Sequence, residues 1–307
     1  MASLWRMTRL VRTILSFGET LWDLLPDGAV LGGAPCNLAY RVNAFGERGL
    51  IVTRLGRDER GRTAFDRIRA LGMDTGLIQW DERKPTGTVP VTVDAKGVPD
   101  FTIVEDVAYD HIEATPALLA AAAGADCVCF GTLVQRSAGS RDALRRVLEA
   151  APRALKVLDL NLRRRCYTRE TVEHSLKAAD ILKLNDGESM ELARTFGLKG
   201  ETPEEAAREC RSRWDLDACV VTLGERGAYG VTAREEAATG GWKVEVADTI
   251  GSGDAFTAAF LTGWLRGRSL EDCVTVGNAL GAMVARTKGA TAPIGADEII
   301  RFCGRTI

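Results

Sequence analysis

A glycine-rich turn flanked by two acids, from Asp248 to Asp254, leads directly into residues 255–260, which have the composition of a helix. Free backbone N–H groups and the positive end of the helix dipole meet at such a turn, so it suits an anion. Gly251 and Gly253 let the backbone approach the anion closely because they carry no Cβ. Asp254 would lie beside that anion, and the alternative is that it only caps the helix. Capping needs a single acid, whereas Asp248 supplies a second one across the turn.

Three other glycine-containing segments lie where a ligand could bind. Residues 32–37 (GGAPCN) open an amphipathic helix that we expect to run to about Phe45, with Asn37 as a candidate cap. Residues 222–227 (TLGERG) follow a predicted strand, where a phosphate or ribose could dock, and residues 185–188 (NDGE) follow another. Each of them is also explained by an ordinary turn, because Gly, Asn and Asp occupy most turns.

Several familiar site motifs are absent from the sequence. It has no G-x-x-x-x-G-K-[ST] and no G-x-S-x-G, which excludes a P-loop and an α/β-hydrolase nucleophile elbow. Its single G-x-G, at 251–253, has Phe256 where a dinucleotide fingerprint needs a third glycine. His111 and His174 are the only histidines, and their spacing matches neither a metal site nor a catalytic triad.

The elements that must position these segments are short apolar runs alternating with amphipathic stretches. This alternation indicates βαβ units, hence an α/β fold with a central, mostly parallel sheet and helices on both faces. Ligands of such sheets bind beyond the carboxyl ends of the strands. The predicted strands are residues 13–17, 51–55, 127–130, 156–160, 181–184 and 219–223, each followed by a helical pattern such as 142–150, 169–179, 188–196 or 203–214.

One region departs from this alternation. Residues 86–93 and 99–104 read as two strands joined by 94–98 without a helix, which predicts a partly solvated β-hairpin. Residues 21–31 add a short strand pair around Pro26, Asp27 and Gly28. We therefore expect one domain, residues 12–305, that carries a small β flap made of residues 21–34 and 84–108.

Composition limits the class of protein. The 307 residues are 46% apolar, and 40 Lys and Arg against 42 Asp and Glu give a formal charge of −2. Intrinsic disorder and binding to the nucleic-acid backbone are therefore not expected. No apolar run approaches the roughly 20 residues that span a bilayer, and the first 18 residues lack the apolar core of a signal peptide. The one excess is glycine, with 32 residues.

The eight cysteines show no C-x-x-C spacing. Cys127 and Cys129 are the nearest pair, but two thiols without a nearby histidine make a poor metal site, and we expect buried small apolar side chains instead. So many thiols without a disulfide framework favour a cytoplasmic protein.

Taken together, GGAPCN at 32–37, with Gly46 and Gly56 behind it, and DTIGSGDAFTAAF at 248–260 resemble the two signatures of the ribokinase-like (PfkB) carbohydrate kinases. The resemblance extends from about Thr13 to Arg301 and implies the three-layer fold of that family. It also implies transfer of the γ-phosphoryl group of ATP to a primary hydroxyl of a small sugar. In that reaction Asp254 would be the general base, and the N–H groups of Gly251, Ser252 and Gly253 would form the anion hole. Family members usually have Ala at the position of Ser252.

The resemblance also implies the cofactors ATP and Mg²⁺, with K⁺ as a third ligand. Glu188, together with Asn185, would organise Mg²⁺ through water, whereas Asp248, the Ile250 carbonyl and carbonyls of residues 284–289 would hold K⁺. The nucleotide positions implied in this way are Asn185, Thr222, Gly224, Gly227 and Asn278. The substrate positions are Asp23, Gly33, Asn37 and Arg163, the last with the alternative of a solvated charge in the run 163–165.

The acceptor sugar stays open at this point. The segments FGETLWDLLPDG, EDVAYDHI and NLR are most similar to bacterial fructokinases, but ribose, 2-keto-3-deoxygluconate, tagatose phosphate or a nucleoside are alternatives. Two other classes are a nucleotide-dependent oxidoreductase, which would need the missing fingerprint, and a non-catalytic sugar- or nucleotide-binding protein. Flap strands of the family can pair between subunits, so a homodimer is an open alternative. No nucleic-acid or membrane partner is expected.

Overall fold

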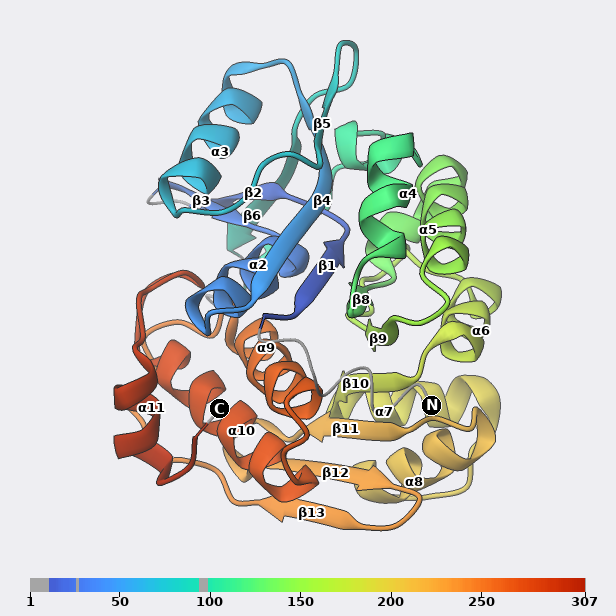
Figure 1. Ribbon diagram of the computed structural model, residues 1–307, viewed down its shortest axis with the longest axis vertical. Helices are drawn as coiled ribbons and strands as arrows, with labels where there is room; N and C mark the ends of the chain where they lie inside the picture. The colour runs from blue at the N-terminus through green and yellow to red at the C-terminus, as the bar shows by residue number, and fades with distance from the viewer. Residues whose placement is uncertain (1–10, 26–27, 94–98, 307) are drawn as a thin grey trace.

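The computed structural model describes residues 11–25, 28–93 and 99–306. The predicted turn at Pro26 and Asp27, the connection at residues 94–98 and the N-terminal residues 1–10 lie outside the described residues. Within them, a large twisted sheet with helices packed against it carries a second, smaller sheet on one side (Figure 1).

The large sheet has the order β13-β12-β11-β10-β9-β8-β1-β4-β5 among the described residues, so β1 is an interior strand between β8 and β4. All pairings from β5 to β11 are parallel, and β12 and β13 are antiparallel additions at one edge. The six predicted strands are present, and their ends differ from the prediction by no more than three residues. The strands are β1 (Thr13–Phe17), β4 (Arg48–Gly56), β5 (Ile78–Asp81), β8 (Cys127–Phe130), β9 (Leu155–Asp159), β10 (Ile181–Asn185), β11 (Ala218–Thr222), β12 (Ala228–Thr232) and β13 (Glu236–Thr239).

The expectation that every predicted strand is followed by a helix is wrong for β1, which continues into the flap strand β2 (Leu21–Leu25), and for β11. After Thr222 the chain makes only a short 3₁₀ turn, η3 (Gly224–Arg226), and returns as β12. Gly227 permits this return, since its φ is +106° and a Cβ there would lie 1.9 Å from the Thr239 carbonyl oxygen. The predicted strand at 219–223 is therefore part of an antiparallel hairpin and not of a βαβ unit.

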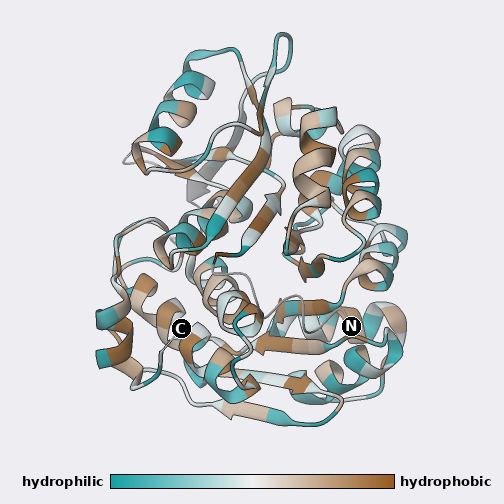
Figure 2. Cartoon of the chain, in the orientation of Figure 1, coloured by the Kyte–Doolittle hydropathy of each residue, from teal (hydrophilic) through white to brown (hydrophobic). Residues whose placement is uncertain are grey.

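Alternate side chains of the parallel strands point to opposite faces and form two cores. Leu15 and Phe17 of β1 pack toward the helices α4 to α8, whereas Ile14 packs toward α2, α9 and α10. Strands that are buried on both faces have continuous apolar sequences. The apolar parts of these strands are coloured brown in Figure 2. The sheet is thus the middle layer of three, as the resemblance implies.

The helices that form the outer layers start mostly at side chains that bond the first turn. Thr168 and Thr202 accept from the N–H groups of Thr171 and Glu205, and Asp58 accepts from Gly61. The helices are α2 (Ala34–Ala44), α3 (Glu59–Ala70), α4 (Pro116–Ala123), α5 (Ala138–Ala150), α6 (Arg169–Ala178), α7 (Asp186–Phe196), α8 (Pro203–Arg213), α9 (Ser252–Leu265), α10 (Leu270–Ala285) and α11 (Ala296–Cys303), with 3₁₀ turns η1 (Ala108–His111) and η2 (Leu133–Arg136).

The small sheet has the order β3-β2-β6-β7 and contains the predicted flap strands. Its strands are β2 (Leu21–Leu25), β3 (Gly28–Gly32), β6 (Gly87–Val93) and β7 (Pro99–Phe101), so β7 is shorter than the predicted 99–104. β2 begins four residues after β1 ends, so the small sheet leaves the main sheet at the carboxyl end of its central strands.

The expectation about the cysteines also has an outcome. All eight cysteines are free thiols and seven are buried, as expected for small apolar side chains. Within the described ranges no three or more His, Cys, Asp or Glu side chains are grouped to hold a metal ion. In the same part of the chain, no helix combines the length and the apolar character that crossing a membrane requires.

Candidate active site

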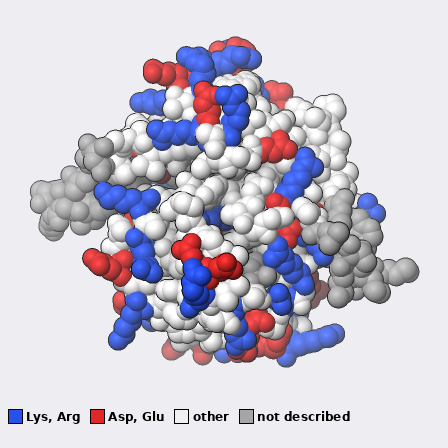
Figure 3. Space-filling view, turned by 60° about the vertical axis from the view of Figure 1, so that its left-hand side comes forward, with Lys and Arg blue, Asp and Glu red and all other residues white. Residues whose placement is uncertain are grey.

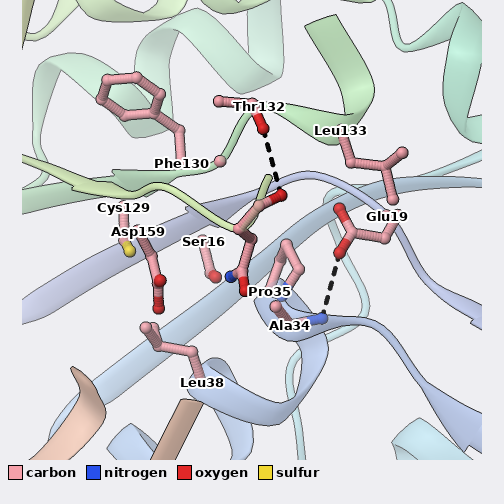
Figure 4. A pocket seen from close by; sticks show the side chains of 12 residues that line it. Ser16, Glu19, Ala34, Pro35, Leu38, Cys129, Phe130, Thr132, Leu133 and Asp159 are labelled. Atoms are coloured by element: carbon pink, nitrogen blue, oxygen red, sulfur yellow. Dashed lines mark hydrogen bonds between the residues drawn. The ribbon is translucent and has the colours of Figure 1, made fainter. Parts of the chain in front are cut away.

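A pocket lies where the central strands end, at the edge of the sheet that binds ligands in such folds. About 340 Å³ of space, part of it open to solvent, lies between its lining residues. Ser16 and Glu19 reach it from the end of β1, Asp159 from the end of β9, and Pro35 from the start of α2 (Figure 4). Its walls therefore combine two carboxylates with apolar side chains, which suits a small polar ligand.

The start of α2 is shaped by Gly33. Its φ is +109°, and a Cβ would lie only 2.4 Å from the Glu19 carbonyl oxygen, so no other residue fits this backbone. The helix then begins at Ala34, whose N–H donates to Glu19 Oε1 at 3.2 Å. Gly33 is thus the N-cap, and the alternative that Asn37 caps this helix is wrong.

Asn37 instead contacts the second signature segment, residues 248–260. Its buried Nδ2 donates to Asp254 Oδ2 at 2.8 Å, across 217 positions of sequence. The helix α9 begins at Ser252 with Gly251 as its N-cap in the left-handed region, φ +80°, so Asp254 is the third helical residue. The alternative that Asp254 only caps α9 is therefore wrong, and its carboxylate is turned toward α2.

The surroundings of Asp254 change its acidity. Burial and the nearby Asp159 raise the pKa of Asp254 to about 6, against the lowering effects of Asn37, Lys183 and Arg163. A carboxyl with this pKa is mostly ionised at neutral pH yet accepts a proton more readily than an exposed aspartate. This is the property that a general base requires.

Two more carboxyls near the pocket have raised pKa values. Burial raises the pKa of Glu19 to about 7, and the Asp254 charge adds to that rise. Burial also raises the pKa of Asp23, on β2, to about 6. The exposed Arg163 lowers the pKa of both, so its guanidinium balances part of their charge although it lies at the surface.

The glycine turn before α9 is held by contacts from distant segments. A Cβ on Gly251 would lie 2.3 Å from Ala290 Cβ, and the buried Arg41 of α2 donates to the carbonyls of Ala290 and Ala292 at 2.6 and 2.7 Å. Asp248 closes the same loop, since its Oδ1 accepts from Ile250 N at 2.9 Å and its Oδ2 from Gly289 N at 3.1 Å.

Ser252 takes a position in this turn that differs from the expected one. Its N–H donates to the Thr249 carbonyl oxygen at 3.2 Å and would have to leave that bond before binding an anion. Its buried Oγ has no hydrogen-bond partner among the residues that the structure describes. An alanine would lose no contact of that hydroxyl there.

The expected nucleotide positions lie beyond the ends of β10 and β11. Asn185 and Glu188 form a capping box of α7, with Asn185 Oδ1 accepting from Glu188 N at 2.8 Å and Glu188 Oε2 from Asn185 N at 2.9 Å. Glu188 Oε1 also accepts from Leu162 N at 2.9 Å, so both of its oxygens already have backbone partners.

The remaining nucleotide positions belong to the β11–β12 hairpin and to α10. Thr222 ends β11, and Gly224, with φ +59°, begins the turn in an exposed position. Asn278 of α10 is buried and donates to the Gly240 carbonyl oxygen at 2.9 Å. These contacts bring α10 against the segment after β13, but Asn278 Nδ2 already has a protein partner.

Four charged residues at the site were not predicted: Glu19, Arg41, Asp159 and Lys183. Glu19 and Asp159 could have been found, because they lie at or just after the ends of predicted strands, where ligands bind. Arg41 and Lys183 gave no usable signal, since a cation within a helix or an apolar strand does not reveal its partner.

Comparison with known proteins agrees with the resemblance. The model of the pfkB family carbohydrate kinases matches residues 28–297. Fructokinase-1 of rice is 30% identical over 90% of this chain and 93% of its own length. The crystal structure of a sugar kinase from Pyrococcus horikoshii is 26% identical, with a TM-score of 0.81 over 94% of this chain and 97% of that chain. A fructokinase of Xylella fastidiosa with bound ATP shares the fold at 23% identity, with a TM-score of 0.83 over 95% and 98% of the two chains.

With a family match over most of the chain and the two signatures joined by the Asn37–Asp254 bond, this chain belongs to the pfkB family of carbohydrate kinases. It is an ATP-dependent phosphotransferase on the ribokinase-like fold, as its sequence predicts.

Proposed function

We propose that this kinase is a fructokinase in which Asp254 is the general base. The oxygen of a primary hydroxyl attacks the γ-phosphorus of ATP, the bond to the bridging oxygen breaks, and ADP leaves. Asp254 takes the hydroxyl proton, while N–H groups of the turn at Gly251, Ser252 and Gly253 bind the transferred group. The observation that supports the proposal is the Asn37–Asp254 hydrogen bond, which joins α2, the helix proposed to bind the sugar, to the first turn of α9, proposed to bind the phosphate.

The charge of the pocket supports a neutral acceptor. Glu19 and Asp159 line it. Arg163 is near enough to lower the pKa of Glu19, Asp23 and Asp254, so these three carboxyls share one cation. Carboxylates accept hydrogen bonds from hydroxyls but repel an anion. Neutral sugars are therefore favoured over tagatose phosphate or 2-keto-3-deoxygluconate, which are anions. Among the neutral acceptors, several relatives at 28–30% identity are fructokinases, and this favours fructose. We assign Asp23, Gly33, Asn37 and Arg163 to the sugar.

The cofactor positions follow the same proposal. Glu188 already accepts two backbone N–H bonds, and the described residues contain no group of three or more His, Cys, Asp or Glu side chains that could hold a metal ion. We therefore expect Mg²⁺ to arrive with ATP, to lie near Asn185 and Glu188, and to keep most of its water. The Asp248 loop, with the Ile250 carbonyl, would bind K⁺. Thr222, Gly224, Gly227 and Asn278 would face the nucleotide.

Two broader assignments belong to the proposal. The free thiols suit the reducing cytoplasm. In addition, the flap would join two subunits, since β3 and β7 are the outer strands of the small sheet and an open edge can pair with another strand. Basic and acidic side chains are interspersed over the surface in Figure 3, so that view shows no basic face suited to nucleic acid.

The test measures ADP release from ATP with Mg²⁺ and K⁺ present, using fructose, ribose, 2-keto-3-deoxygluconate and nucleosides as acceptors. We expect the highest kcat/KM with fructose and the lowest with the anionic acid. A ribose or nucleoside preference would keep the kinase and reject the fructose assignment. If no acceptor stimulated ADP release, a non-catalytic binding protein would be the better interpretation.

A further inference from the structure

A buried ion pair lies beneath the helix that carries Asp254. Asp159 and Lys183 face each other in register on the neighbouring parallel strands β9 and β10, with Lys183 Nζ 3.0 Å from Asp159 Oδ1. Each residue is only 5% exposed. Removing two charges from water costs more than many such pairs recover, and apolar residues of similar size often serve stability as well or better. Stability alone therefore gives no reason for this pair.

The pair touches the first turns of α9 at two places. Thr257 Oγ1 lies 2.7 Å from Asp159 Oδ2 and 3.0 Å from the Gly253 carbonyl oxygen, so its hydroxyl bridges the strand and the turn. Lys183 Nζ lies 3.1 Å from the place that a Cβ on Gly253 would take. Asp254 follows Gly253 directly and precedes Thr257 by three positions, so the pair contacts the helix before and after the proposed base.

We propose that Asp159 and Lys183 are positioning residues of the phosphoryl transfer, which hold the first turn of α9 and set the charge surroundings of Asp254. This inference rests on the proposed role of Asp254 as the base and adds residues that act through it.

Several groups from different elements act on Asp254, and the pair differs from the others in contacting Gly253 and Thr257 in the first turns of its helix. Asp159 raises the pKa of Asp254, whereas Lys183 and Arg163 lower it. Glu19, Cys36 and Cys129 also interact with the charge of Asp254, from the end of β1, from α2 and from β8. Removing one member of the pair should therefore shift the acidity of Asp254, and removing the other should shift it in the opposite direction.

The experiment compares the pH dependence of kcat/KM in Asp159→Asn, Lys183→Met, the double variant and Thr257→Val. We expect the acidic limb to move to lower pH in Asp159→Asn and to higher pH in Lys183→Met, by about one pH unit each. It should return toward the wild-type position in the double variant. Thr257→Val, which removes a hydrogen bond but no charge, should leave the limb in place. Shifts in the same direction for both single variants, or none, would overturn the proposal.

A second measurement separates this inference from the identity of the base. Titration of the Asp254 carboxyl by ¹³C NMR, with its resonance identified by its loss in Asp254→Asn, reports the same shifts without any turnover. If Asp254→Asn stays active, the base assignment fails while the titration still tests the pair. If Lys183→Met does not fold, Asp159→Asn decides the question, since an amide keeps the shape and can still accept from Thr257. An unmoved titration in that variant would reject the proposal.

Discussion

Asp254 and Asp272 occupy equivalent places in their helices and differ in what surrounds them. Each is the third residue, of α9 and α10 respectively. Asp272 meets the exposed Arg305 at 2.9 Å, whereas Asp254 bonds the buried Asn37. Helix position is therefore not what distinguishes Asp254, and a comparison of the two residues isolates the effect of the site.

We expect Asp254→Asn to lower kcat by at least about 10²-fold, because the loss of a general base removes a contribution of that size. The KM for ATP should change little. Asp272→Asn, the matched control, should keep wild-type turnover. Steady-state kinetics with fructose and circular dichroism of both variants check this, and a near-native kcat in Asp254→Asn would leave its carboxylate with only a structural role.

Glu19 makes the protein less stable as the pH rises. Its folded pKa of about 7 lies above the ordinary glutamate value of 4.5, so between these pH values the folded protein binds more protons than the unfolded chain. The contribution of Glu19 to the free energy of unfolding is therefore full below pH 4.5 and is lost as the pH rises through about 7. The loss is on the order of 3 kcal/mol. The cost follows from burial of the carboxylate, which outweighs the backbone hydrogen bonds from Glu19 and Ala34 that lower its pKa.

Glu19→Gln should remove that cost and keep the acceptor for Ala34 N. We expect its free energy of unfolding to exceed that of the wild type at pH 8, by up to about 3 kcal/mol, and to match it near pH 4.5. Urea denaturation at both pH values measures the difference, with the exposed Glu245→Gln as control. An equal effect at the two pH values would contradict the assignment.

At the scale of elements, α9 has a left-handed glycine at each end, and the two serve different purposes. Gly251, at the N-cap, has φ +80° and Ala290 within 2.3 Å of a Cβ position. Gly267, just beyond the helix C-terminus, has φ +75° and open space around it. The backbone conformation alone explains the second glycine, whereas the first is also required by a neighbouring segment.

Gly267→Ala should lose about 1 kcal/mol of unfolding free energy, from left-handed strain alone. Gly251→Ala should lose more and should also lower kcat, because the contact with Ala290 must open before the turn can form. Urea denaturation and turnover of both variants make the comparison. Equal losses of stability with unchanged kcat would show that the Ala290 contact has no influence on the site.

At the scale of the whole molecule, the edge strands of the small sheet carry the prediction of a dimer. We expect light scattering to give twice the 33.1 kDa of one chain. The reason is that a sheet whose outer strands remain unpaired gains backbone hydrogen bonds by pairing with a second copy. A mass of 33.1 kDa at micromolar concentration would reject the flap as an interface.

The sequence is sufficient for those parts of the fold that depend on local patterns. Apolar runs locate β1, β8 and β10, and the alternation of strands and helices predicts the parallel sheet. Nothing local distinguishes β12, since the return at Gly227 depends on contact with Thr239 from a later strand. The site divides in the same way: the turn before Asp254 is visible in the sequence, but its bond to Asn37 and the Asp159–Lys183 pair join residues far apart.

The helix α2 contacts both halves of the site through residues one turn apart. Asn37 bonds the base, and Arg41, four positions later on the same side of the helix, holds the segment that packs on Gly251. Because one helix fixes both contacts, we expect from the proposed roles of these residues that the acceptor hydroxyl and the phosphoryl group lose their alignment together. Substitutions that displace α2 should therefore change the kinetic constants for sugar and for nucleotide together, so the two would covary across a mutant series.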